Sequence, residues 1–564
     1  MDRRQFLLGS AAMVALAACE TLPVDGGRLL DAVVRGGTVY DGTGAEGRRA
    51  DVGISGDRIV AVGDLSDVAA SRVVDARGMA VTPGFINMLS WANESLLHDG
   101  LSQSDIRQGV TLEVMGEGDS MGPLSPRTKA EMIKQQSDIK YDVPWTTFGG
   151  YFELLEKRGI STNVASYVGA ATIRMHEVGY DNRKATRKEL ARMQDLVRAS
   201  MREGAMGVGS SLIYAPGSFA NTDELVALTA AAHEFGGGYI SHIRSEADRF
   251  LEAIDELIVI GRRTGAPVQM YHMKPAGQAN WNKSQAAIDK MNAARAAGVD
   301  VTANIYTYTA GATGLDAAMP LWVQEGGHDA WVARLKQPAV RARVLREMRG
   351  KPVGWENLYR AAGGPDKVIL IAFKNDKLKL LTGKTLAEVA ALRGTSPEDT
   401  MIDLVIEDGS RVGAAYFVMD EANIRRNIAW GWTSVGSDAE SLAPEGVFLK
   451  SNPHPRAYGC FARFFAKYVR EERVISLAEG VRRVTGLPAA NLRLKDRGRL
   501  AQGLMADVVV FDPDKIQDHA TFAKPHQYST GVSQVFVNGV QVLRDGEHTG
   551  AKPGRFVRGP GFKV

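Results

Sequence analysis

The 564-residue sequence has little cysteine and little excess charge of either sign. It contains only two cysteines, Cys19 and Cys460, and the first lies in a segment that we expect to be processed, which leaves no pair for an internal disulfide. The net charge is +3, with no basic stripe that would suit nucleic acid and no acidic tail. No internal repeat or low-complexity tract is present. With 45% hydrophobic residues, the chain is long enough for one large domain and smaller ones.

The N-terminal stretch "MDRRQFLLGSAAMVALAAC" has the features of an export signal. The pair Arg3 and Arg4 precedes an apolar stretch of small residues that is too short for a membrane-spanning helix. The arginine pair resembles a twin-arginine signal, and "LAAC" resembles a bacterial lipobox, whose cysteine is cleaved free and acylated. We therefore expect residues 1–19 to be a signal peptide and Cys19 to anchor the mature protein in the periplasmic cell envelope, its only membrane contact. The alternative is a plain secretory signal with an incidental cysteine.

Both ends of the remaining chain carry short strand patterns separated by Gly, Asp and Asn turns. "DAVVRGGTVYDGTG" and "ADVGISGDRIVAVG" lie at one end, and "ADVVVFDP" and "VSQVFVNGVQVLRDG" lie at the other. We predict that residues 28–82 and 490–564 form one small β-sandwich domain.

Residues 83–489 alternate strand patterns with helical patterns, which is typical of βα units around a parallel sheet. Eight candidate strands predict an α/β fold, a (β/α)₈ TIM-like barrel. An insertion at about 316–430 separates the last two strands, and such insertions usually shape the site at the carboxyl ends of the strands. The candidate strands are Val81–Ile86, Thr111–Gly116, Asn163–Gly169, Met206–Gly209, Gly238–His242, Pro267–His272, Asp300–Ile305 and Trp432–Ser437.

Several of these strands end on a residue that can bind metal or move a proton, where a barrel keeps its active site. His242 and His272 follow consecutive strands, Asp438 follows the last strand, and Glu117 follows "TLEVMG". A lone histidine is usually structural, Asp438 could be a helix cap, and Glu117 could be solvated on a loop. Two histidines on neighbouring strands together with an aspartate favour a metal site.

Stretches along the chain, three of which contain His242, His272 and Asp438, resemble one known family. "VTPGFI", "QGVT", "GVGSSLIYAPG", "SHIRSEAD", "HMKPAG", "GSDAES" and "HPRAYG" are similar to the D-aminoacylase, or N-acyl-D-amino-acid deacylase, branch of the amidohydrolase superfamily. The resemblance implies that His242 and His272 hold zinc and that Asp438 is the general base of a metal-activated hydrolysis. It also implies that the substrate is a small N-acyl amino acid or a dipeptide-like amide.

The sequence departs from the pattern of this branch at its metal ligands. The family's His-x-His pair is Leu89-Ser90-Trp91 here, and neither Leu89 nor Trp91 can bind a metal. The family's metal-binding cysteine aligns with Gly118, but the neighbouring Glu117 offers a carboxylate in its place. Asn304 stands where relatives often carry an aspartate. We expect one zinc per chain, held by Glu117, His242 and His272, with Leu89 and Trp91 forming an apolar wall of the pocket.

Three further residues are candidates for binding the substrate's carboxylate. Arginine offers two parallel donors to a carboxylate, which suits Arg456 in "HPRAYG", although a structural salt bridge is the alternative. The resemblance adds Lys274 and a tyrosine of "NIYTYTAG", either Tyr306 or Tyr308.

Three functions remain open at this point. The first is an amide hydrolase acting on N-acyl-D-amino acids or related small amides and dipeptides. The second is a catalytically silent binding protein that keeps the barrel and has lost its metal. The third is a hydrolase of cyclic amides or esters. Leu89 and Trp91 favour the second. The first is favoured by four residues together: His242, His272, Lys274 and Asp438.

The lipid anchor gives a direct prediction. Replacing Cys19 by Ser removes the acceptor of the acyl chains, so the protein should move to the soluble periplasmic fraction or stay unprocessed. Fractionation and the mass of the mature N-terminus measure this. A Ser variant that is still processed and still sediments with membranes would contradict the anchor.

Overall fold

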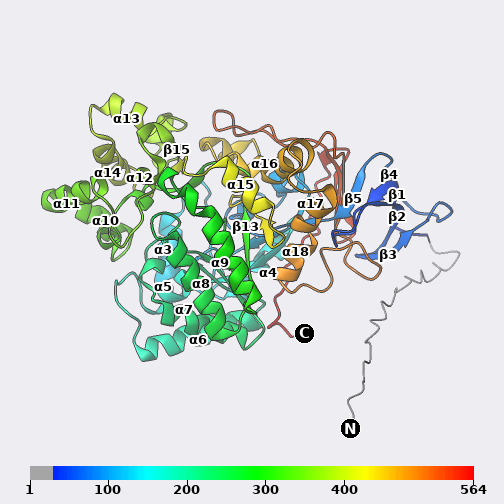
Figure 1. Ribbon diagram of the computed structural model, residues 1–564, viewed down its shortest axis with the longest axis horizontal. Coiled ribbons are helices and arrows are strands. Elements are labelled where there is room, and N and C mark those ends of the chain that lie inside the picture. Colours follow the sequence, from blue (N-terminus) through cyan, green and yellow to red (C-terminus); the bar gives the residue numbers. More distant parts are fainter. Residues whose placement is uncertain (1–28, 564) are drawn as a thin grey trace, which may run out of the picture.

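The computed structural model describes residues 29–563, and the fold is organised around a closed barrel of parallel strands (Figure 1). Strands β8 and β9 are successive segments of one strand position, so two parallel sheets of three and six segments supply eight positions. The amide of Met88 donates to the Val435 carbonyl at 3.3 Å and joins the first position to the last. The segments are β6 (Phe85–Asn87), β7 (Val110–Met115), β8 (Asn163–Ser166), β9 (Val168–Gly169), β10 (Gly207–Ser211), β11 (Gly238–His242), β12 (Val268–Met270), β13 (Val301–Ile305) and β17 (Thr433–Val435).

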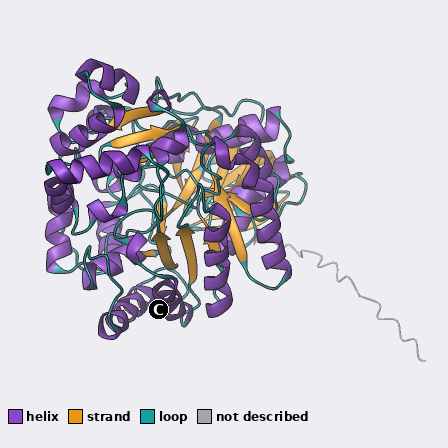
Figure 2. Cartoon of the chain, turned by 60° about the vertical axis from the view of Figure 1, so that its left-hand side comes forward, coloured by secondary structure: helices purple, strands orange, loops and turns teal. Residues whose placement is uncertain are grey.

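Helices surround these strands, as Figure 2 shows with helices in purple outside strands in orange. Helix α8 illustrates why: its buried apolar residues recur every three or four positions, which gives one stripe that faces the barrel. A capping box between Thr186 and Glu189 satisfies backbone N–H groups at the start of α6. The barrel helices are α5 (Ala170–Glu177), α6 (Arg187–Arg202), α7 (Thr222–His233), α8 (Phe250–Thr264) and α9 (Ser284–Ala296).

Further helices precede and follow this series. Before it lie α1 (Ser95–His98), α2 (Gln103–Ile106), α3 (Pro126–Gln135) and α4 (Phe148–Arg158). After the last barrel strand come α16 (Arg456–Arg463), a π-helix (Phe464–Glu471), α17 (Leu477–Val484) and α18 (Gly486–Asn491). Within residues 29–563, no helix has both the length and the apolar character that crossing a bilayer requires.

A second sheet of nine strands lies beside the barrel and draws its strands from both ends of the chain (Figure 1, β1 to β5). The two ends meet where β18 pairs with β5 in antiparallel register. Apolar side chains from the N-terminal and C-terminal strands, such as Val52 and Val510, pack in one core cluster. The strands are β1 (Ala32–Val39), β2 (Arg48–Ser55), β3 (Arg58–Gly63), β4 (Val73–Asp75), β5 (Ala80–Pro83), β18 (Val508–Phe511), β19 (Val532–Val537), β20 (Val540–Arg544) and β21 (Glu547–His548). The predicted fold class, a TIM-like barrel with an additional β domain, is confirmed.

The run Val81–Ile86, which we expected to be one barrel strand, is divided between the two sheets. Strand β5 ends at Pro83 in the nine-stranded sheet, and β6 starts at Phe85 in the barrel. The chain changes sheet at Gly84, where a Cβ atom would lie 2.0 Å from the Thr111 hydroxyl oxygen. Both halves are apolar because both are buried, so hydrophobicity alone did not indicate the division.

The segment between β13 and β17 forms a layer of its own over the barrel. Its three strands, β14 (Gly311–Gly314), β16 (Gly413–Tyr416) and β15 (Val368–Ala372), form an antiparallel sheet. In Figure 1 its green helices project at the upper left. They are α10 (His328–Leu335), α11 (Pro338–Arg349), α12 (Leu358–Ala362), α13 (Leu386–Arg393) and α14 (Pro397–Asp408), and α15 (Glu421–Ile428) leads back to β17.

Candidate active site

Three side chains meet beyond the carboxyl ends of β7, β11 and β12. The Nδ1 atom of His242 lies 3.0 Å from Oε1 of Glu117, and Nε2 of His272 lies 2.8 Å from the same oxygen. One ligand atom from each of the three residues lies within 4.8 Å of the other two, and all three residues are buried. A carboxylate oxygen and two imidazole nitrogens at this spacing form a donor set that zinc accepts, with room for a further ligand.

A second carboxylate lies behind both histidines. Oε1 of Glu246 is 3.0 Å from Nδ1 of His272, and Oε2 is 3.6 Å from Nε2 of His242. Lys274 donates to Glu246 at 2.6 Å and lies 2.8 Å from Nδ1 of His272. Metal-binding histidines commonly point their second ring nitrogen at a carboxylate, which fixes the ring. The three residues and Glu246 therefore fit a metal ion.

The sequence analysis did not identify Glu246. It lies four residues after His242, in the stretch "SHIRSEAD" that carries the family resemblance. A carboxylate shortly after a candidate ligand is the signal that could have found it.

Asp438 lies next to this group, between Trp91 and Arg456. The indole N–H of Trp91 donates to Oδ1 of Asp438 at 3.1 Å and also to Oε2 of Glu117 at 3.0 Å. Nη1 of Arg456 lies 2.9 Å from the other oxygen of Asp438, Oδ2. Asp438 thus has a cation on one oxygen and a neutral donor on the other.

Burial and neighbouring charges set the protonation of these groups. Burial raises the pKa of Glu117, but the charges and hydrogen bonds of His272 and His242 outweigh it and hold that pKa well below its usual range. Burial and Lys274 lower the pKa of His272, yet Glu246 and Glu117 raise it to about 9. Burial raises the pKa of Asp438 against the opposing charge of Arg456. Glu117 is therefore ionised and able to bind a cation, and Asp438 has a higher proton affinity than an exposed aspartate.

Two of the site residues have strained backbones. His272 has φ +32 and Asp438 has φ +53, the left-handed region that costs a non-glycine residue roughly 1–3 kcal/mol. Backbone and side-chain acceptors hold both residues: Asn304 Oδ1 accepts from the His272 amide at 2.7 Å, and the Leu89 carbonyl accepts from the Asp438 amide at 2.8 Å. An aspartate at position 304 would offer the same acceptor, so this departure from the family pattern leaves the contact in place.

Position 118 has no room for a side chain. Gly118 has φ +79, and a Cβ atom there would lie 2.5 Å from Cβ of Ser211. The neighbouring Glu117 side chain is the one that reaches the histidines. In this chain a cysteine could not simply stand at Gly118, because the backbone turn and Ser211 both exclude it.

Leu89 and Trp91 do not form the apolar wall that we expected. Leu89 is fully buried in a core cluster inside the barrel and does not line the cavity. Trp91 lines the cavity, but it presents its N–H to two carboxylates. The expectation was wrong because it considered only the apolar part of these side chains and not the indole donor.

The candidate carboxylate-binding residues lie together on one side of the site. The guanidinium carbon of Arg456 is 4.5 Å from the centre of the Tyr306 ring, and Nζ of Lys274 is 5.6 Å from it. The Tyr306 hydroxyl is buried without a hydrogen-bond partner among residues 29–563. Tyr308 instead donates to Asp518 at 3.2 Å and does not line the cavity. Of the two tyrosines, Tyr306 is the one beside the candidate metal ligand His272.

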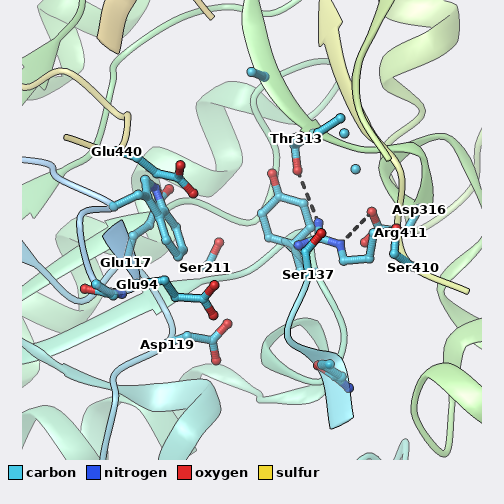
Figure 3. Close-up of a pocket in the computed structure, with 18 of the residues that line it drawn as sticks. Glu94, Glu117, Asp119, Ser137, Ser211, Thr313, Asp316, Ser410, Arg411 and Glu440 are labelled. Atoms are coloured by element: carbon cyan, nitrogen blue, oxygen red, sulfur yellow. Dashed lines mark hydrogen bonds and ion pairs between the residues drawn. The ribbon is translucent and has the colours of Figure 1, made fainter. Parts of the chain in front are cut away.

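The site opens into a cavity of about 790 Å³. Figure 3 shows the carboxylates of Glu94 and Asp119 pointing toward its middle, with Arg411 on the opposite side. Arg411 belongs to the layer over the barrel and bonds to Asp316 at 2.8 Å and Thr313 at 3.2 Å. The insertion therefore lines the side of the cavity that faces the candidate metal ligands.

A family model, related sequences and solved structures all match this chain over most of its length. The profile of the Amidohydrolase family matches residues 72–543. D-aminoacylase of Alcaligenes xylosoxydans xylosoxydans is 34% identical over 530 residues, covering 93% of this chain and 97% of that protein. N-acyl-D-glutamate deacylase from Bordetella bronchiseptica, solved with zinc and a phosphonate inhibitor that mimics the tetrahedral intermediate, is 30% identical and has a TM-score of 0.79, covering 94% of this chain and 100% of that chain.

A structure of D-aminoacylase is 33% identical to this chain, with a TM-score of 0.77, and covers 93% of this chain and 99% of that chain. For that D-aminoacylase, the binuclear metal centre is described as giving activation by one metal and attenuation by the second.

The tight packing at Gly118 leads to a prediction. Gly118→Ala should displace Glu117 and weaken zinc binding by about tenfold or more, the usual result of disturbing the support of a metal site. Zinc affinity measured by competition with a chelator tests this.

Gly78→Ala is the matched control, because Gly78 has nearly the same φ, +80, with nothing within 4 Å of the added Cβ. Equal zinc affinity in the two variants would contradict the packing argument.

Proposed function

This chain belongs to the amidohydrolase family, and we propose that it hydrolyses the amide bond of N-acyl-D-amino acids or related small amides and dipeptides. One observation carries the proposal: the Glu117 carboxylate and two imidazoles converge on one point beside Asp438, at the carboxyl ends of the barrel strands. The identity to D-aminoacylase over nearly the whole chain supports the substrate class.

In this proposal Glu117, His242 and His272 hold zinc. Zinc supplies a Lewis acid there and lowers the pKa of water. Glu246 orients the histidines. Asp438 takes a proton from the attacking water and delivers it to the leaving amine, a role that its raised pKa favours.

Arg456, Lys274 and Tyr306 bind the substrate's carboxylate. Burial raises the pKa of Tyr306 to about 12, so its hydroxyl keeps its proton and donates. Because Arg456 lies against Asp438 Oδ2, a substrate carboxylate that attracts Arg456 would leave this oxygen free to accept a proton. Binding and proton transfer would then depend on one guanidinium.

We further infer one zinc per chain. Positions 89 and 91 carry no imidazole, and Leu89 is buried away from the cavity. Within residues 29–563, Glu117, His242 and His272 are the only convergent group of three potential ligands. The silent binding protein remains the second candidate, favoured by the same Leu89 and Trp91.

We also propose that the protein is exported and lipid-anchored at Cys19 in the periplasm. The sequence of residues 1–19 supports this, and these residues lie outside the described part of the chain. A domain that binds its metal before export would suit a twin-arginine signal.

The proposed roles of Glu117 as a metal ligand and Asp438 as the general base predict different effects of substitution. Elemental analysis should give close to one zinc per chain, and a chelator should abolish an activity that zinc restores. Glu117→Ala should lose zinc and activity together. Asp438→Asn should keep zinc and lose activity by about 100-fold or more, the usual scale of a general base.

Glu440→Gln, another carboxylate that lines the cavity, is the control for zinc content. Two tightly held zinc ions, or full activity in Glu117→Ala, would contradict the proposal. The absence of zinc, together with no hydrolysis of a panel of N-acyl-D- and N-acyl-L-amino acids, would favour the binding protein.

The proposed binding of the substrate's carboxylate by Arg456 predicts a loss of activity that depends on the substrate. Arg456→Ala should lower kcat/KM for an N-acyl-D-amino acid strongly, mainly through KM, and should change hydrolysis of the matched primary amide much less. An equal loss on both substrates would show that Arg456 acts only as the partner of Asp438.

A further inference from the structure

We propose that the indole N–H of Trp91 takes the place of a second cation in this centre, holding the Glu117 and Asp438 carboxylates together and confining the site to one metal ion. The proposal rests on the proposed function for the role of Asp438. Its metal-binding part stands on the geometry of Trp91 alone.

Trp91 is placed to bridge the two carboxylates. Its Nε1 is 3.0 Å from Oε2 of Glu117 and 3.1 Å from Oδ1 of Asp438, so one N–H is shared by two acceptors. Trp91 follows β6, whereas Glu117 follows β7 and Asp438 follows β17, the strand position on the other side of β6. The indole therefore connects the loops after three adjacent strand positions across the barrel's closure.

The two carboxylates need such a bridge. Both side chains are nearly buried, and each has an oxygen within 3.1 Å of the same indole nitrogen. Two like charges brought close in a poorly solvated site repel, and only a proton, a cation or a shared donor relieves that repulsion. An indole N–H donates a hydrogen bond without losing its proton near neutral pH, and it has no lone pair to offer a metal.

The arrangement leaves Glu117 with distinct tasks for its two oxygens. Oε1 faces both histidines, where we place the single metal ion, and Oε2 faces Trp91. A second cation between Glu117 and Asp438 would need the oxygens that the indole already occupies. Leu89 supplies no ligand in compensation, because its side chain is fully buried in the barrel core and only its backbone carbonyl contacts Asp438.

Trp91 is thus a positioning residue that acts through Glu117 and Asp438. It fixes Asp438 by one oxygen, Oδ1, and leaves Oδ2 to Arg456. The binuclear centre of D-aminoacylase is linked to second-metal attenuation. In this chain we expect no attenuation, because the second position is filled by a side chain.

The test uses the zinc-free and zinc-loaded full-length protein with three substitutions. Trp91→Phe removes the N–H and keeps a ring, and Trp91→His replaces the donor by a side chain that can bind a metal. Trp331→Phe is the matched control, because Trp331 also lines the cavity and its N–H has no partner among residues 29–563. Zinc affinity and stoichiometry are measured by equilibrium dialysis with elemental analysis, and kcat and KM are measured with and without excess zinc.

The wild type and Trp331→Phe should hold one zinc and keep their rate in excess zinc. Trp91→Phe should bind zinc about tenfold more weakly, as expected when the hydrogen-bonding partner of a metal ligand is lost. Its kcat should fall about tenfold because Asp438 loses its orientation. KM should change less than threefold, because the residues that bind the substrate's carboxylate remain in place. Trp91→His should take up more than one zinc at high concentration, and excess zinc should lower its rate.

Several results would overturn the proposal. One is a Trp91→Phe variant with the zinc affinity and kcat of the wild type. Another is a wild type that binds two zinc ions with similar affinity. If Trp91→Phe does not fold, Trp91→His becomes the test. A folded Trp91→His variant that holds only one zinc, and whose kcat does not change in excess zinc, would refute the proposal. If the wild type binds one zinc but cleaves no N-acyl amino acid, the proposed function fails while the zinc affinities still test the bridge.

Discussion

The centre depends on two imidazoles that face the same carboxylate oxygen. Placing His242 and His272 within hydrogen-bond distance of Glu117 Oε1 requires the chain at the carboxyl ends of β7, β11 and β12 to meet within a few ångströms. A parallel barrel achieves this because every strand delivers its following loop to the same end. Glu246 then pairs with the positive charge of Lys274 and contacts both histidines in a buried space. Without that second carboxylate, burial would lower the pKa of Lys274 and favour loss of its charge.

Backbone geometry contributes as much to the site as the side chains do. His272 and Asp438 both adopt left-handed conformations, and acceptors on neighbouring strands or loops hold them there. Gly118 turns the chain so that Glu117 points at the histidines, in a space that leaves no room for a Cβ atom. Strain of this kind persists only where the surrounding structure determines the conformation, which is typical of functional sites. The rigidity of the barrel and the chemistry of the centre are therefore linked at individual residues.

The sequence indicated the strands, the barrel and the residues at the strand ends because each depends on local pattern. Apolar runs followed by His242, His272 and Asp438 placed these side chains at one end of a parallel sheet before any contact was known. The motifs added the family, which the comparisons bear out. The same reasoning missed Glu246, because it considered the residues at the strand ends and not the carboxylate four positions after His242. It also merged β5 with β6, because both are buried and apolar.

By itself, the sequence determined the fold class and indicated the candidate metal ligands, since hydrophobic periodicity and residue type are local properties. Only the tertiary structure decided how these side chains are used. It placed Leu89 in the core and turned Trp91 into a shared donor, although both positions had the same interpretation in the sequence. It selected Tyr306 over Tyr308 as the tyrosine that faces the cavity. The physical reason is that hydrogen bonds and charge pairing depend on distances between residues hundreds of positions apart, which no local pattern encodes.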